Sequence, residues 1–285
     1  MITAAPAAPS TAATLLVRII EPRSGWAPID WAELWEFREL LGFLVWRDVK
    51  LRYKQTVLGA AWAILQPVMT MLMFTVLFGR WAQIPSDGFP YSVFAFAALL
   101  PWTFFANALG SAAASLHGNA HLISKVYFPR LIISLSPLGT GLIDLLVALV
   151  VMLALMAWYG IAPGFQLLAL PLFIALTAGV AFGVGSALAA LCAIYRDVRY
   201  VIPLLTQLWL FASPVIYPMH FVPERWRGVF YLNPLVGAIE GFRSSLLGLP
   251  FNWPAIASAW VVTIAICWLS LSYFQRVERR LADLI

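Results

Sequence analysis

Residues that could carry out chemistry are few in this sequence, and their spacing restricts what they could do. His117 and His121 are four residues apart, which would place two imidazoles on one helical face, as a metal-binding pair requires. Catalytic zinc needs three protein ligands, and no Asp, Glu or Cys stands near these histidines. We therefore expect no metal site, and we interpret both histidines as surface or partner-contact residues.

The lysines do not form a phosphate-binding motif. None of Lys50, Lys54 and Lys125 is preceded by Gly or followed by Ser or Thr, so the sequence has no P-loop. We expect no cofactor on this chain. If ATP drives this protein, a different chain must bind ATP and Mg²⁺ and carry out the hydrolysis.

Three further charged residues stand in apolar surroundings. Asp144 is a carboxylate well inside an apolar stretch, where an acid is costly. A proton or ion relay and a structural hydrogen bond to a neighbouring helix are both open, and we favour the second because the apolar stretch holds no basic partner. Glu240 and Arg243 are three residues apart and could pair on one helical turn. They could form a simple local ion pair or shape an exit.

The composition indicates a membrane protein. Hydrophobic residues make up 62% of the 285 residues and charged residues 11%, against roughly 25% charged in an average soluble domain. The uncharged stretches, cut at turn signals, predict an all-α fold with six transmembrane helices. We place these spans near 58–78, 91–116, 134–158, 167–191, 201–217 and 254–274.

Three segments with different properties follow from the pattern. Residues 1–30 begin with Ala, Pro, Ser and Thr and predict a disordered lead-in. Residues 31–54 predict an amphipathic helix on the cytoplasmic surface; its apolar face holds Leu34, Phe37, Leu41, Leu44 and Val45. Residues 55–285 form the six-span domain, in which the proline-rich region 218–253, between spans five and six, predicts re-entrant or interfacial helices.

The distribution of Lys and Arg sets the orientation. With both termini in the cytoplasm, fourteen of the 18 Lys and Arg residues lie inside and four lie outside, at Arg80, Arg225, Arg227 and Arg243. Four of the inside charges, Arg47, Lys50, Arg52 and Lys54, immediately precede the uncharged residues 55–79. The net charge of +5 is therefore a topology signal that favours anionic lipid headgroups and gives no reason to expect nucleic acid.

Aromatic residues are abundant, with 13 Trp, 19 Phe and 9 Tyr. Many are expected at the two membrane interfaces. Trp62, Phe74, Trp209 and Phe211 fall inside predicted spans, where aromatic faces in a wet channel would suit sugars. Packing between helices is the alternative for each of them. Gln66 adds an amide to the first span.

An ordered set of motifs carries a resemblance to a known family. The motifs are RDVKLRYKQTVLGAAWAILQP (47–67), GNAHLISKVYFPR (118–130), YRDVRY (195–200), SPVIYP (213–218), Asn233-Pro234 and Glu240-Gly241-Phe242-Arg243. Together they resemble the membrane subunit of bacterial polysaccharide ABC exporters, from about residue 31 to the end of the chain.

The resemblance implies a function and a set of partners. Two copies of a six-span permease would pair with two ATPase subunits in the bacterial inner membrane and export O-antigen, capsule or teichoic-acid polymers, usually lipid-linked. Residues that contact the ATPase would be Asn119, His121, Leu122, Lys125, Tyr127, Phe128, Pro129, Arg130, Tyr195, Arg196 and Asp197. Spans one and five would line the channel through Trp62, Gln66, Phe74, Trp209, Phe211, Ser213 and Tyr217. The region containing Glu240 and Arg243 would cap its outer end.

Two other classes of protein remain open. A membrane-embedded transferase for lipid-linked sugars or acyl groups would need clustered acids or histidines at one face, whereas the outside acids Asp87, Glu224 and Glu240 are far apart in sequence. An ion-coupled flippase would be expected to show repeated halves and several intramembrane polar residues. Retention of an ATPase chain on purification would distinguish an exporter permease from both.

Overall fold

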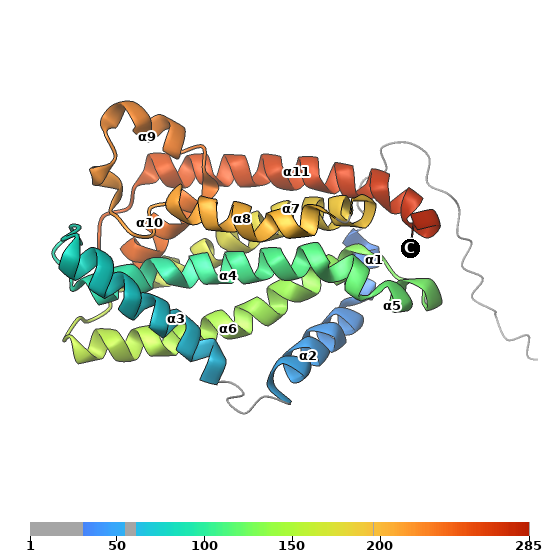
Figure 1. Ribbon diagram of the computed structural model, residues 1–285, viewed down its shortest axis with the longest axis horizontal. Helices are drawn as coiled ribbons and strands as arrows, with labels where there is room; N and C mark the ends of the chain where they lie inside the picture. Colours follow the sequence, from blue (N-terminus) through green and yellow to red (C-terminus); the bar gives the residue numbers. More distant parts are fainter. Residues whose placement is uncertain (1–30, 55–60, 196, 285) are drawn as a thin grey trace, which may run out of the picture.

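The computed structural model describes residues 31–54, 61–195 and 197–284 of the chain (Figure 1). Within these ranges the protein is all-helical and contains no β-strand. The predicted lead-in and the junction between the basic patch and the first span lie outside the described residues. Long helices run side by side along the molecule, and short helices gather at its two ends.

Five helical segments are long and apolar enough to cross a membrane. They match predicted spans one to four and six. The first joins α3 to a π-helical turn, η1, and the fourth joins a 3₁₀ turn, η2, to α7. The elements are α3 (Ala61–Phe74), η1 (Thr75–Trp81), α4 (Tyr91–Gly118), α6 (Leu131–Trp158), η2 (Phe165–Ala169), α7 (Leu170–Ile194) and α11 (Trp253–Leu284).

The helix in the fifth predicted span, 201–217, ends at Phe211 and is shorter than a membrane crossing requires. Helix α8 (Val198–Phe211) has 14 residues and would extend about 21 Å, whereas the hydrocarbon core of a bilayer is about 30 Å thick. The predicted count of six membrane-length helices is therefore not confirmed in the described part of the chain. Pro214 explains the early end, because it lacks an N–H and disfavours helical geometry in Ser213 before it.

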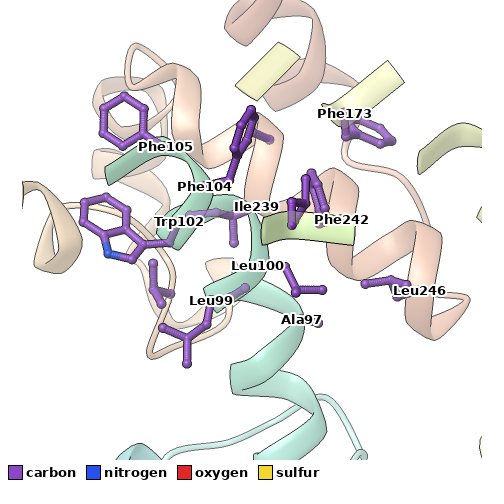
Figure 2. Packing of buried hydrophobic residues seen from close by; sticks show 14 of the residues in the cluster. Ala97, Leu99, Leu100, Trp102, Phe104, Phe105, Phe173, Ile239, Phe242 and Leu246 are labelled. Carbon is purple, nitrogen blue, oxygen red and sulfur yellow. The ribbon is translucent and has the colours of Figure 1, made fainter. Parts of the chain in front are cut away.

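Helix α4 lies at the centre of the molecule. It contacts α6, α7, α3, α8 and the short helix α10 (Pro234–Leu247), and most of its side chains are buried. Figure 2 shows its residues Leu100 and Phe104 beside Phe173 of α7 and Phe242 of α10. The buried α10 thus packs among helices of membrane length although it is half their size.

The short helices fall into two groups at opposite ends of the molecule (Figure 1). The α5 end holds α1 (Trp31–Glu36), α5 (Ala120–Lys125) and the last turns of α11. The α9 end holds η3 (Met219–Phe221), α9 (Glu224–Phe230) and the start of α4.

The predicted amphipathic segment 31–54 consists of two helices, because a turn at Phe37 separates α1 from α2 (Arg38–Lys54). Its apolar face packs on the protein. Leu44 is buried against the start of α6, with Leu34, Phe37 and Leu41 around it.

Candidate functional site

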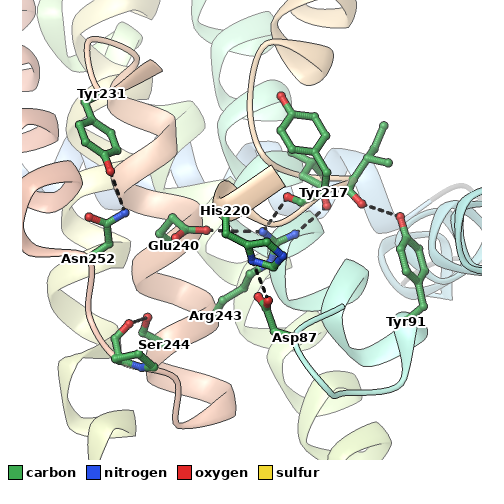
Figure 3. A network of polar contacts seen from close by, with 12 residues as sticks. Asp87, Tyr91, Tyr217, His220, Tyr231, Glu240, Arg243, Ser244 and Asn252 are labelled. Atoms are coloured by element: carbon green, nitrogen blue, oxygen red, sulfur yellow. Dashed lines mark hydrogen bonds and ion pairs between the residues drawn. The ribbon is translucent and has the colours of Figure 1, made fainter. Parts of the chain in front are cut away.

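Arg243 of α10 is the centre of a polar cluster at the α9 end (Figure 3). Its side chain is 2% exposed, and Nη2 donates to the Val215 carbonyl at 2.8 Å while Nη1 donates to the Tyr217 carbonyl at 3.3 Å. Glu240, one turn earlier on α10, lies 3.7 Å from Nη1, so the expected local ion pair is present. Burial lowers the pKa of Arg243 to about 10, which leaves it charged at neutral pH.

The segment 212–218, which follows α8, has no regular helix, and side chains from distant elements bind its backbone. The Tyr91 hydroxyl donates to the Ile216 carbonyl at 2.7 Å. Asn233 Nδ2 donates to the Ala212 carbonyl at 3.1 Å and to Ser213 Oγ at 2.9 Å. Irregular backbone can lie at membrane depth only where protein groups satisfy its polar atoms. These contacts and those of Arg243 satisfy the backbone carbonyls of residues 212, 215, 216 and 217.

A second polar contact lies in the same region (Figure 3). His220 Nδ1 of η3 is 3.2 Å from an oxygen of Asp87, in the loop before α4. Burial raises the pKa of the Glu240 carboxyl, and the Arg243 charge opposes this shift. We use the name α9-end cluster for Asp87, His220, Glu240, Arg243 and residues 212–218. Polar side-chain contacts and hydrogen bonds to the backbone join three separate parts of the chain in this cluster.

At the opposite end, the coupling segment (residues 119–130) links α4 directly to α6. Asn119 Nδ2 donates to the Ser115 carbonyl at 2.9 Å, which closes the end of α4. His121 and Lys125 are exposed, whereas Leu122 packs inward against the apolar residues of α1 and α2. Pro129 is half-buried.

The two aromatic residues of the coupling segment differ in exposure. Tyr127 is 56% exposed, and its hydroxyl donates to Glu33 Oε1 of α1 at 3.3 Å. Phe128 is 5% exposed and packs with Leu44, Ile132 and Ile133. The contact of Phe128 with an ATPase stays a prediction; in this structure its ring fills the space between α2 and α6 and does not lie on the surface.

The second predicted contact region follows α7. Tyr195 and Asp197 are both exposed, and Arg196 lies outside the described residues. Their exposure makes these side chains accessible to a partner.

Helix α2 is attached to α6 by polar contacts. Arg52 forms an ion pair with Asp144, and Ser136 Oγ donates to Asp48 Oδ2 at 2.7 Å. No basic partner was expected within the span itself, and the partner of Asp144, Arg52, comes from helix α2, 92 residues earlier. The contact supports a structural role for Asp144. Arg47 bonds Asp48 at 2.8 Å, and the side chains of Lys50 and Lys54 are exposed.

The predicted channel-lining residues separate into two groups. Trp62, Gln66 and Phe211 are exposed. The others make contacts within the protein. Phe74 packs edge-on to Phe78, with ring centres 5.4 Å apart, and the Trp209 and Phe105 ring centres are 5.0 Å apart. Trp209 Nε1 donates to Asn233 Oδ1, the Tyr217 hydroxyl donates to the Phe211 carbonyl, and Ser213 is buried.

An open cavity of about 370 Å³ lies between α4 and α8, lined mainly by apolar atoms. Trp102 lines its α4 side and Thr206 and Gln207 its α8 side.

Residues 39–247, which are more than half of the chain, match the ABC-2 type transporter family. The chain belongs to this family. It is 30% identical over 257 residues to the O-antigen export system permease protein RfbA of Myxococcus xanthus, with 89% of this chain and 98% of that protein covered. It is 26% identical to an O-antigen export system permease protein RfbA of Klebsiella pneumoniae, with 87% of this chain and 95% of that protein covered. It is 24% identical to the polysialic acid transport protein KpsM of Escherichia coli, with 81% of this chain and 91% of that protein covered.

Several residues of this ABC-2 protein that contact the α9-end cluster were not assigned a role from the sequence. Tyr91 and Phe94 had no local signal, because their contacts lie more than one hundred residues away in the chain. Asn233 did have one: Asn followed by Pro is a helix N-terminal signature, and Asn233 Oδ1 accepts the Leu235 N–H at 3.1 Å as the N-cap of α10.

Proposed function

We propose that this chain is the membrane subunit of an ATP-driven exporter of a cell-surface polysaccharide. Support comes from its membership of the ABC-2 family, its five membrane-length helices, and relatives covered over most of their length that carry O-antigen and polysialic acid transport in their names. We further propose that two copies assemble with two ATPase subunits in the bacterial inner membrane, with both termini in the cytoplasm. A lipid-linked polymer is the proposed substrate.

The observation that carries this proposal is the position of α5. It joins the ends of α4 and α6, two helices of 28 residues each, through a turn of only a few residues on either side. Displacement of α5 by a partner would therefore reach both long helices. Exposed His121, Lys125 and Tyr127 offer that partner a basic and aromatic surface.

The sixth crossing of the membrane is proposed to consist of α8 together with the non-helical segment 212–218. The α9-end cluster supports it, because Arg243, Tyr91 and Asn233 satisfy backbone carbonyls that a lipid environment would leave unpaired. In this arrangement α10 is a re-entrant helix, and the cluster holds the outer end of the path.

The test is purification of the tagged permease from cells that express its neighbouring genes, followed by an ATPase assay on the complex and quantification of surface polysaccharide. We expect an ATPase chain to co-purify, and Tyr127→Ala to lower export about tenfold while ATP hydrolysis continues. The matched control is Tyr127→Phe, which keeps the ring, removes the hydroxyl that bonds Glu33, and should keep most export. Wild-type permease that purifies without an ATPase, or unchanged export in Tyr127→Ala, would contradict the proposal.

A further inference from the structure

Arg130 and Glu278 contact each other twice, although 148 residues separate them in the sequence. The backbone N–H of Arg130 donates to Glu278 Oε1 at 3.3 Å, and Arg130 Nη1 donates to the backbone carbonyl of Glu278 at 2.9 Å. Arg130 is the last residue of the coupling segment and the N-cap of α6, and Glu278 lies in the final turns of α11. The end of the coupling segment is thus tied to a helix with which it has no chain continuity.

Both contacts have favourable electrostatics. The Glu278 carboxylate lies at the N-terminus of α6, where the helix dipole is positive, and the charged Arg130 guanidinium makes a charge-assisted hydrogen bond to the Glu278 carbonyl. In a capping box the side chain at N3 accepts the N–H of the N-cap residue, but the N3 residue of α6 is the apolar Ile133. Glu278 therefore supplies from α11 the acceptor that α6 does not supply for itself.

Apolar packing brings the same elements together. A cluster at the α5 end joins the last turn of α4, the first turn of α6 and the end of α11, and Ile123 of α5 packs against it. Its buried members are Leu116, Leu131, Ala189, Ala190, Phe274 and Val277. Since apolar packing has no preferred direction, it permits sliding, whereas the paired contacts of Arg130 with Glu278 fix one position.

We propose that Glu278 is a positioning residue that fixes the coupling segment to α11, so that a displacement of the segment moves α6 and α11 together. The inference rests on the proposed docking of the coupling segment on an ATPase. Without the Glu278 carboxylate, α5 would still be joined to α4 and α6 by the chain. Helix α11 would keep the bond from Arg130 Nη1 to the Glu278 carbonyl and the apolar contacts, but it would lose its contact with the backbone N–H at the start of α6. A displacement of α5 would then move α4 and α6 but move α11 less, and less polysaccharide would be exported for each ATP hydrolysed.

The experiment compares variants of the full permease in complex with its ATPase. Glu278→Ala removes the carboxylate acceptor, whereas Glu278→Gln keeps an oxygen acceptor at the same place. Ser272→Ala is the control on the same helix. In the described residues the Ser272 hydroxyl donates to the Trp268 carbonyl of α11 itself. Surface polysaccharide is measured in cells lacking the native gene copy, and the ATPase rate is measured on each purified complex. Hydrogen exchange of residues 119–131 is measured on the same complexes.

We expect Glu278→Ala to lower the polysaccharide exported per ATP hydrolysed about fivefold, the effect of one lost hydrogen bond, and to speed exchange in residues 119–131. Glu278→Gln and Ser272→Ala should stay close to wild type in both measurements. An unchanged ratio in Glu278→Ala, or a lower yield of complex with an unchanged ratio, would overturn the positioning role. If Tyr127→Ala lowers export and Glu278→Ala does not, this role alone fails; if no ATPase binds the wild type, the proposed function fails.

Discussion

The guanidinium carbon of Arg243 lies 3.6 Å from the centre of the Phe94 ring, in the interior of the protein. The ring belongs to the central helix α4, and the guanidinium also binds two carbonyls of the segment 212–218. One buried cation therefore connects α10, α4 and the residues that follow α8. A cation held against an aromatic face away from water is worth about 2 kcal/mol or more, which adds to its hydrogen bonds.

Replacing Arg243 should destabilise the protein strongly. Arg243→Met would leave the Val215 and Tyr217 carbonyls and the Glu240 carboxylate without their cation, at a cost of more than about 3 kcal/mol. Arg243→Lys keeps the charge but cannot bind both carbonyls with a planar fork, so it should fall between Met and wild type. The measurement is thermal unfolding in detergent, and Met and Lys variants that melt with the wild type would show that the cluster is dispensable.

Glu240 should give the stability of the protein a pH dependence. Burial raises its pKa in the folded state above the ordinary value of 4.5, so the folded state favours the protonated carboxyl despite the nearby Arg243. Its contribution to stability is therefore greatest at acidic pH and is lost as the pH rises through the folded-state pKa.

Melting temperatures of wild type and Glu240→Gln, measured in detergent from acidic to neutral pH, test this effect. The difference between the two proteins should move in favour of the Gln variant as pH rises, because the amide does not ionise. Asp87 and His220 are present in both proteins, so the comparison changes only the Glu240 carboxyl. Parallel melting curves across the range would exclude the effect.

The contact between Arg52 and Asp144 should stabilise the attachment of α2 to α6. Arg52→Ala leaves the Asp144 carboxylate, which is mostly buried, without this partner, and we expect a loss of about 1 to 2 kcal/mol, between the values for exposed and buried pairs. Asp144→Asn should cost less, because an exposed Arg52 can be hydrated. The double variant should be more stable than the sum of the single effects predicts, and strict additivity would indicate no coupling between the two side chains.

The packing of α10 leaves no space for a larger residue at Gly237. A Cβ added there would lie 2.5 Å from the Ala255 carbonyl oxygen of α11. Because that atom is backbone, relief requires the two helices to move apart, and Gly237→Ala should destabilise by about 1 to 3 kcal/mol. The control is Gly110→Ala in α4, where no described atom lies within 4 Å of the added Cβ. Equal melting temperatures for both variants would contradict the close packing.

Tyr127 and Phe128 should give different defects although they are adjacent. Phe128→Ala removes a buried ring and should cost about 3 to 5 kcal/mol of stability. Tyr127→Ala changes an exposed residue and should leave the unfolding temperature within about one degree while export falls. Unfolding curves of both variants, measured beside Phe128→Leu as a milder core replacement, test this separation. A similar loss of stability in Tyr127→Ala would place both rings in the core.

Much of the architecture could be predicted from the sequence because it depends on local properties. A run of uncharged residues long enough to cross a bilayer is visible without any tertiary contact, and predicted spans one to four and six correspond to membrane-length helices. The pairing of Glu240 with Arg243 follows from their separation by three residues on one helix. The missing P-loop is likewise a property of the sequence alone.

Other features were decided only by the tertiary structure, because they depend on groups far apart in the chain. The charged partner of Asp144 comes from α2, and Phe128 is buried because α2 covers it. Pro214 accounts for the early end of α8, but only the tertiary structure shows that Arg243, Tyr91 and Asn233 bind the backbone carbonyls that follow it. Local periodicity indicates which face of a helix is apolar, but it does not indicate which other helix packs against that face. In this protein the packing of one helix on another decides the contact of Arg52 with Asp144 and the contacts of Arg243 with residues 212–218.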